Sequence, residues 1–249
     1  MRFVILAQRR TGSNHLVALL RSHVDLICFG EIFNRNFNFK KHWSEMNNLW
    51  HKHHERDKNA KEFLLAGEKT IPKESSAWGF KLMPNHVSED TLATILAKKV
   101  DRIIFLNREN LLARYSSDLI AKKTGQGVAG RNAEIKMEKV KFRSKEFNDF
   151  CNKIYSNEEK ILRILDKIKT PILNIAYGDL SDPKTHCNLC NLLEVKNIPL
   201  ISGHKKRNNV SVANRFKNVE FLRSYILNNG LNRWILETKY NDQENRIEK

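Results

Sequence analysis

Three short apolar runs, spread along the chain, constrain the fold of this sequence more than any other feature. They are Arg2–Ala7 (RFVILA), Arg102–Leu106 (RIIFL) and Pro171–Ala176 (PILNIA). A continuous apolar run of this length is typical of a strand that is buried on both faces of a sheet. A stretch with helical periodicity follows each run, so that strands alternate with helices. This order predicts an α/β domain of three layers with a central parallel sheet.

Weaker patterns supply the remaining elements. The further predictions are helices over 15–23, 87–98, about 110–123, 144–168 and 184–193, short strands over 25–29 and 78–83, and mixed helix and loop over 40–76. Neither an internal repeat nor a clean linker divides the 249 residues. We therefore expect a single domain over residues 1–235, followed by a polar tail over 236–249.

The charge of the chain points to anionic partners. Its 44 Lys and Arg against 28 Asp and Glu give a formal net charge of +16. Such an excess attracts nucleic acid, anionic membranes, or small phosphorylated and sulfated ligands. A Lys-rich, solvated surface is the plainer interpretation. Charge alone does not choose among these.

Other features of the sequence bear on the compartment. No apolar run approaches the ~20 residues of a membrane span. The first run, Phe3–Ala7, is too short for the core of a signal peptide. Four unevenly spaced Cys do not form a disulfide framework in a chain of this size. We therefore expect a cytoplasmic protein without a transmembrane segment.

A polar segment with one glycine, Arg9–Asn14 (RRTGSN), separates the first run from its helix. Ligands of parallel α/β sheets bind beyond the carboxyl ends of the strands, where this segment lies. Gly12 allows close backbone approach, the amides at a helix N-terminus favour an anion, and Arg10 adds a fixed positive charge. Further hydrogen-bonding side chains are those of Thr11, Ser13 and Asn14. The segment therefore suits a phosphate or sulfate group.

This segment has two other interpretations. Ser13 or Thr11 could simply cap a helix with exposed Arg neighbours. A Walker A loop is disfavoured, because Ala7 stands where its first Gly belongs and Ser13 where its Lys belongs. An ordinary P-loop ATPase or GTPase is therefore not expected.

A second polar segment follows the run Arg102–Leu106. Arg108 stands at the end of that strand, and Ser116 lies two turns into the following helix. A guanidinium group binds phosphate through two hydrogen bonds, and a hydroxyl group can add another. A helix that starts at Arg108 and Glu109, with Ser116 incidental, is the alternative.

These residues resemble the sulfotransferases that use 3′-phosphoadenosine-5′-phosphosulfate (PAPS). The segment RRTGSNHL is similar to their 5′-phosphosulfate loop, a basic residue followed by [ST]-G-[ST]. Arg108 and Ser116, eight residues apart after a core strand, resemble their 3′-phosphate motif. The resemblance implies a P-loop-like sulfotransferase fold.

The similarity is greatest to the bacterial branch that resembles trehalose, Nod-factor and lipopolysaccharide sulfotransferases. Its G-E-x-F segment corresponds to Gly30–Phe33, and its G-x-K-L-M segment to Gly79–Met83. A late basic segment, Lys205–Asn208, and the helix entry over 214–220 are also similar. The correspondence spans most of residues 2–225. It implies sulfuryl transfer from PAPS to a hydroxyl group of a carbohydrate or glycolipid.

The resemblance also implies roles for single residues. Arg10 and the amides of residues 11–14 would stabilise charge on the leaving phosphate. Arg108 and Ser116 would hold the 3′-phosphate, and the basic residues Lys205, Lys206 and Arg207 could add contacts to it. Glu31 would be the base that accepts the hydroxyl proton. The remaining candidates are His15 as a second base and Lys81 beside the sulfuryl group.

The chain departs from the family pattern at two places. Asn14 and His15 replace the small or hydroxyl residues that are common after the loop. Tyr177–Leu180 (YGDL) resembles the family's Y-E-D-L with Gly at the acidic position, and we interpret it as structural.

Other motifs carry less weight. The sequence G-x-G-x-x-G at 125–130 follows a helix rather than a strand, so we interpret it as a loop near the acceptor. Cys187 and Cys190 form a lone C-x-x-C, and we expect no metal.

We therefore expect a PAPS-dependent sulfotransferase that acts by in-line displacement, releases adenosine 3′,5′-bisphosphate (PAP) and binds no nucleic acid. The alternatives are a kinase-like phosphotransferase, which would need a loop lysine and Mg²⁺ ligands, and a basic nucleic-acid-binding protein. The second would bind its ligand with a steep dependence on salt, but no recognition-helix or aromatic RNA-binding pattern supports it.

Overall fold

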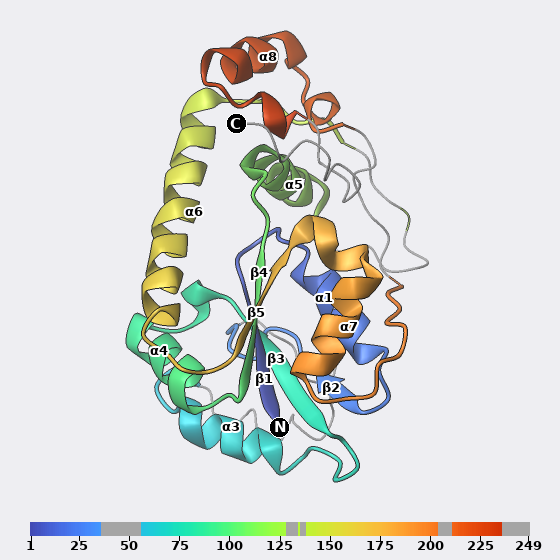
Figure 1. Cartoon of the computed structure of the whole chain (residues 1–249). Helices are drawn as coiled ribbons and strands as arrows, with labels where there is room; N and C mark the ends of the chain where they lie inside the picture. The colour runs from blue at the N-terminus through green and yellow to red at the C-terminus, as the bar shows by residue number, and fades with distance from the viewer. Residues whose placement is uncertain (36–55, 128–133, 135–137, 204–210, 236–249) are drawn as a thin grey trace.

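The central feature of the computed structural model is a sheet of five parallel strands (Figure 1). The structure describes residues 1–35, 56–127, 134, 138–203 and 211–235. The strands are β1 (Arg2–Ala7), β2 (Leu26–Cys28), β3 (Ala77–Leu82), β4 (Arg102–Asn107) and β5 (Ile172–Ala176). Their order in the sheet is β2-β3-β1-β4-β5. The predicted parallel α/β sheet is confirmed, and the three apolar runs form β1, β4 and β5.

Strand β1 is the middle strand and pairs with β3 on one side and β4 on the other. Val4 of β1 stands opposite Phe80 of β3 and Ile103 of β4. The carboxyl ends of these three strands therefore meet at one edge of the sheet, and the segments that follow them start side by side.

Helices cover both faces of the sheet. The helices of the described residues, including two that lie beyond the sheet, are α1 (Ser13–Arg21), α3 (Ala60–Glu68), α4 (Glu89–Lys98), α5 (Leu111–Thr124), α6 (Ser144–Leu165), α7 (Pro183–Leu192) and α8 (Val219–Asn228). Helices α1 and α7 lie on one face, and α3, α4 and α6 lie on the other (Figure 1). Short 3₁₀ turns are Pro84–His86, Tyr177–Ser181, Ala213–Arg215 and Asn232–Trp234.

Alternate side chains of β1 enter different cores. Phe3 and Ile5 pack in the core that includes α1 and α7, whereas Val4 and Leu6 pack in the core that includes α3, α4 and α6. All four are completely buried. This burial on both faces is why the strand reads as a continuous apolar run.

A third hydrophobic cluster lies beyond the carboxyl edge of the sheet, around α5 and α8 (Figure 1). It contains a group of contacting aromatic rings, formed by Tyr115, Phe142, Phe147 and Phe216. Because this cluster packs on one side of α5 and the strand ends lie on the other, all residues of Leu111–Asp118 are buried. Helix α5 therefore presents buried polar side chains to the strand ends.

Several predictions fall wholly or partly outside the described residues. These are the basic residues Lys205, Lys206 and Arg207, residues 40–55 of the predicted helix and loop, the second half of the glycine-rich segment at 125–130, and the tail over 236–249. Within the described part of the chain, no helix is both long enough and apolar enough to cross a membrane.

Candidate active site

Side chains hold the loop that follows β1 by its backbone carbonyls. The Thr11 hydroxyl donates to the carbonyl of Gln8 (2.8 Å), and the Arg114 guanidinium donates to that of Arg9 (3.1 Å). The Arg108 guanidinium donates to the carbonyl of Arg10 (2.9 Å). Three successive carbonyls of the loop thus have side-chain donors, and two of these donors carry a positive charge. The loop conformation is therefore fixed from β4 and α5, across the sheet edge.

The same loop opens into the N-terminus of α1. Gly12 caps this helix in the left-handed region (φ 86°), and its carbonyl accepts hydrogen bonds from the amides of His15 and Leu16. No side chain caps the helix through a hydrogen bond. The first amides of a helix have no acceptor within it, and they carry a partial positive charge. The N-terminus of α1 is therefore a suitable place for an anion.

Gly12 is required for a second reason besides its backbone conformation. A β-carbon at this position would lie 2.6 Å from Cδ2 of Tyr177 and 3.0 Å from Cδ1 of Leu180. Both side chains belong to the 3₁₀ turn after β5. The segment YGDL, which the sequence suggested was structural, therefore packs directly against the loop.

The two arginines of the loop extend to α5. Arg10 also has a positive φ of 61°, and its Nε and Nη2 atoms donate to the Ser117 hydroxyl (3.0 and 2.8 Å). Its Nη1 atom donates to the carbonyl of Gly127 (3.0 Å). The Arg9 guanidinium forms an ion pair with Asp118 (2.7 Å). Helix α5 therefore binds both the backbone and the side chains of the loop.

Arg108 lies at the end of β4 and is almost completely buried. Its guanidinium carbon stands 4.0 Å from the centre of the Tyr177 ring, a cation–π contact. Its amide donates to Asn107 Oδ1 (2.7 Å), and Asn107 in turn donates to Glu158 of α6 (2.8 Å). The predicted phosphate ligand is thus a positively charged side chain with a fixed position beside the loop.

Ser116 faces a different side of α5 from Arg114. The two residues are two positions apart, which places them about 200° apart around a helix. The Ser116 hydroxyl donates to the carbonyl of Ala113 (3.0 Å) and accepts from Nη1 of Arg215 (3.4 Å), a residue of the turn Ala213–Arg215. The structure therefore brings Ser116 together with a buried arginine that the sequence analysis did not name.

Arg114 is a buried cation that the sequence analysis also missed. Its side chain is completely inaccessible, and its Nε and Nη1 atoms have no hydrogen-bond partner among the residues that the structure describes. Burial lowers its pKa to about 10, with Glu158 opposing the change. The group remains protonated near neutral pH and adds positive charge beneath the loop.

Glu31 lies in a polar cluster at the ends of β2 and β3. Its Oε1 atom is 2.7 Å from Nζ of Lys81, and its Oε2 atom accepts from the Asn34 side-chain amide (2.7 Å). Nε2 of His86 lies 3.6 Å from the same Oε2 atom. Lys81 also donates to the side-chain carbonyl of Asn14, in the first turn of α1. This chain of contacts joins the carboxylate to the N-terminal end of the helix.

The cluster keeps the carboxylate ionised. Burial alone would raise the pKa of Glu31, but the charge and hydrogen bond of Lys81 and the hydrogen bond of Asn34 lower it below its usual range. Burial lowers the pKa of Lys81 and that of His86, although Glu31 opposes both changes. With Lys81 bound to it, Glu31 is a weaker base than an ordinary carboxylate.

Arg56 holds the backbone of this cluster. Its Nη1 atom donates to the carbonyls of Ile32 and Asn34, both at 2.7 Å. Arg56 is buried, and burial lowers its pKa to about 10. The turn that carries Glu31 is therefore fixed by a charged side chain from a distant segment.

The candidate residues thus form two linked groups. One group joins Arg10 to Arg108 through the loop, and the other joins Glu31 to Asn14 through Lys81. His15 lies on α1, one residue beyond Asn14. Site residues that the sequence did not suggest are Arg114, Ser117, Arg215, Asn34, Arg56 and His86. Tyr177 was noted in the segment YGDL, but only as structural. The position of Tyr177, directly after a predicted strand, was a further signal that it lies near the site.

Among the residues that the structure describes, no three His, Cys, Asp or Glu side chains gather as metal ligands would. Cys187 and Cys190 are free thiols on α7.

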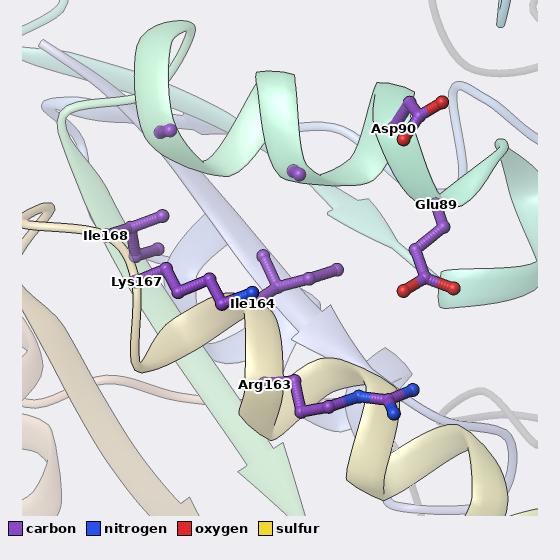
Figure 2. A pocket seen from close by; sticks show the side chains of 8 residues that line it. Glu89, Asp90, Arg163, Ile164, Lys167 and Ile168 are labelled. Atoms are coloured by element: carbon purple, nitrogen blue, oxygen red, sulfur yellow. The ribbon is translucent and has the colours of Figure 1, made fainter.

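A groove of about 580 Å³ lies between α4 and α6 (Figure 2). Glu89 and Asp90 line it on the side of α4, and Arg163 and Lys167 line it on the side of α6. None of the residues of the candidate site belongs to its lining.

The fold has a counterpart among solved structures. A sulfotransferase from Alicyclobacillus acidocaldarius is 14% identical in sequence, and the match covers 94% of each chain with a TM-score of 0.50. No family model and no curated protein sequence matches the chain. The protein therefore has a sulfotransferase-like fold, as its motifs predicted.

Proposed function

We propose that the protein is a sulfotransferase that moves a sulfuryl group from PAPS to a hydroxyl group of a carbohydrate or glycolipid. The observation that carries this proposal is the meeting of three positive features at the carboxyl edge of a sulfotransferase-like sheet. They are the N-terminus of α1, whose cap Gly12 has no side chain, the Lys81 ammonium beside it, and Arg108 at the end of β4. Such a set of donors fits a ligand with two separate anionic groups.

The two ends of the donor would bind different groups. The 5′-phosphosulfate would lie at the N-terminus of α1, where the amides of the first turn, Arg10 and Lys81 can contact it. The 3′-phosphate would bind Arg108 and Ser116, and Arg215 would support the Ser116 hydroxyl. Lys205, Lys206 and Arg207 remain candidates for further contacts with this phosphate.

The chemistry resembles phosphoryl transfer. An acceptor hydroxyl attacks the sulfur atom in line with the leaving phosphate oxygen, on which negative charge develops. Positive groups already fixed at the helix N-terminus would stabilise that charge. Glu31 would accept the hydroxyl proton, and His15 is the second candidate for this role.

The first test is calorimetric binding of PAP, with AMP and ATP as controls. We expect micromolar binding that prefers the free 3′-phosphate over AMP and ATP. Arg108→Ala should abolish this preference. Arg108→Lys should retain only part of it, because an ammonium group cannot form the two parallel hydrogen bonds of a guanidinium group. No binding of PAP, or equal binding of ATP, would refute the sulfotransferase proposal.

The matched control is Arg163→Ala. Arg163 is exposed on α6 in the groove between α4 and α6, so its removal lowers the net charge equally without touching the site. Its affinity for PAP should equal that of the unmodified protein. With binding established, radiolabelled or mass-detected sulfate transfer to a panel of sugars and glycolipids would test the acceptor class.

A further inference from the structure

Lys81 is placed so that one ammonium group serves two sites. Its side chain is 2% exposed, and its Nζ atom contacts Glu31 on one side and Asn14 on the other. Asn14 belongs to the first turn of α1, where the proposed function places an anion. Glu31 is the proposed base. A buried ammonium with three donors therefore stands between the donor-binding end and the proton-accepting end of the site.

We propose that Lys81 couples these two ends: an anion at the N-terminus of α1 draws the ammonium away from Glu31, and the released carboxylate then binds a proton more strongly. This inference rests on the proposed function, because it needs an anionic donor at α1. It assigns Lys81 the role of a switch that keeps the base inactive until the donor is bound.

Competition between the two anions supplies the driving force. A group with two negative charges attracts a buried ammonium more strongly than one carboxylate does, and the interior screens neither interaction well. Asn14 already holds the ammonium toward the helix end, so a small displacement is enough. Arg10 also acts on Lys81, and the repulsion between these two cations opposes the approach of both to one anion.

The surroundings of Glu31 determine how its pKa responds when Lys81 moves. Burial raises the pKa of this carboxylate, and Lys81 is the largest influence that lowers it. The remaining groups that face it are the Asn34 amide and His86, whose own pKa is lowered by burial. Cys28, close to Lys81, has a pKa raised to about 12 by burial and stays neutral. Losing Lys81 therefore leaves a desolvated carboxylate, whose pKa rises.

Linkage makes this coupling measurable without catalysis. If ligand binding raises the pKa of Glu31, then binding is accompanied by proton uptake. The number of protons taken up also sets how steeply the affinity changes with pH. The phosphates of PAP also exchange protons near neutral pH. The contribution of Glu31 must therefore be taken as a difference between variants that bind the same ligand.

The experiment is calorimetry of PAP binding at about pH 5 to 6 in buffers of different ionisation enthalpy, which counts the protons exchanged. The unmodified protein should take up more protons than Glu31→Gln, with a difference of up to about one proton per ligand. Lys81→Met should reduce the proton uptake to that of Glu31→Gln. In the Lys81→Met variant, Glu31 has no ammonium group beside it that the ligand could draw away. Equal proton counts in the unmodified protein and Glu31→Gln would overturn the inference.

A second measurement requires no substitution. The ¹³C resonance of the Glu31 carboxyl group should titrate at a higher pH with PAP bound than without it, and an unchanged titration would overturn the coupling. The proposed function fails in a different way. Absence of PAP binding to the unmodified protein refutes the donor site itself, whereas binding without a proton difference refutes only the role of Lys81.

Discussion

The guanidinium carbon of Arg108 lies 4.0 Å from the centre of the Tyr177 ring, and the edge of that ring closes over Gly12. One aromatic side chain after β5 therefore contacts both the proposed 3′-phosphate ligand after β4 and the loop after β1. The ring fixes the direction of Arg108 by a cation–π contact. It also leaves no room for a side chain at position 12.

Replacing Gly12 by Ala should destabilise the protein and weaken PAP binding together. The left-handed conformation costs a residue with a β-carbon about 1–2 kcal/mol, and the new methyl group would also lie 2.6 Å from the Tyr177 ring. Chemical denaturation and calorimetry would measure both effects. The double variant Gly12→Ala with Tyr177→Ala separates the causes, since it relieves the contact and leaves the backbone strain. Unchanged stability in the single variant would contradict this account.

The adjacent serines of α5 should affect ligand binding differently. Ser116 contacts Arg215, whereas Ser117 accepts two hydrogen bonds from Arg10. Ser116→Ala should weaken PAP several-fold and leave AMP unchanged, because only PAP carries a 3′-phosphate. Ser117→Ala should weaken PAP and AMP by the same factor, because the proposed function places Arg10 at the 5′ end of the ligand. Equal effects of the two substitutions on both ligands would contradict the separate assignments.

The sequence predicted the strands better than the site. β1 and β4 are buried on both faces, so their continuous apolar runs predicted them. β5 lies at the edge of the sheet and is only partly buried, yet its apolar run also predicted a strand. The alternation of strands and helices predicted the parallel sheet. The polar loop after β1 was visible because its residues are contiguous. Arg114 and Arg56 were not visible, since each acts on a backbone carbonyl far away in the chain. Local patterns do not reveal such contacts.

Glu31 shows a further limit of the sequence. A carboxylate in the G-E-x-F segment suggested a base with a tuned pKa. Whether the surroundings raise or lower that pKa depends on Lys81 and Asn34, which only the folded chain places beside it. In the structure the pKa is lowered, so the role of Glu31 as a base requires a change around it.

The lowered pKa of Glu31 predicts how stability depends on pH. A carboxylate whose pKa is lowered in the folded state stabilises the fold above its ordinary value of 4.5, and this contribution is lost as the pH falls through the lowered pKa. The difference in unfolding free energy between the unmodified protein and Glu31→Gln should therefore be constant near neutral pH and shrink below about pH 4.5. Urea denaturation over this pH range measures it.

The control for this titration is Glu159→Gln, which replaces an exposed carboxylate of α6. Its unfolding free energy should follow that of the unmodified protein throughout the range. If the difference in unfolding free energy between the unmodified protein and Glu31→Gln grew on acidification, Glu31 would not be stabilised as an anion.

Arg114 should behave unlike other buried side chains when it is replaced. Its guanidinium is fully buried with two nitrogen atoms that lack hydrogen bonds, and holding that charge in the interior costs free energy. Arg114→Met keeps most of the volume and removes the charge, so we expect the unfolding free energy to stay level or rise.

The carbonyl of Arg9 loses its donor in this variant. The loop should then be less well ordered, and PAP should bind about tenfold more weakly, a difference of about 1.4 kcal/mol. Denaturation and calorimetry on one preparation, with Arg163→Met as the exposed control, test the two effects together. Stability that falls by more than about 3 kcal/mol, the usual result of breaking a buried ion pair, would instead show that Arg114 is paired with Glu158 and supports the fold rather than the loop.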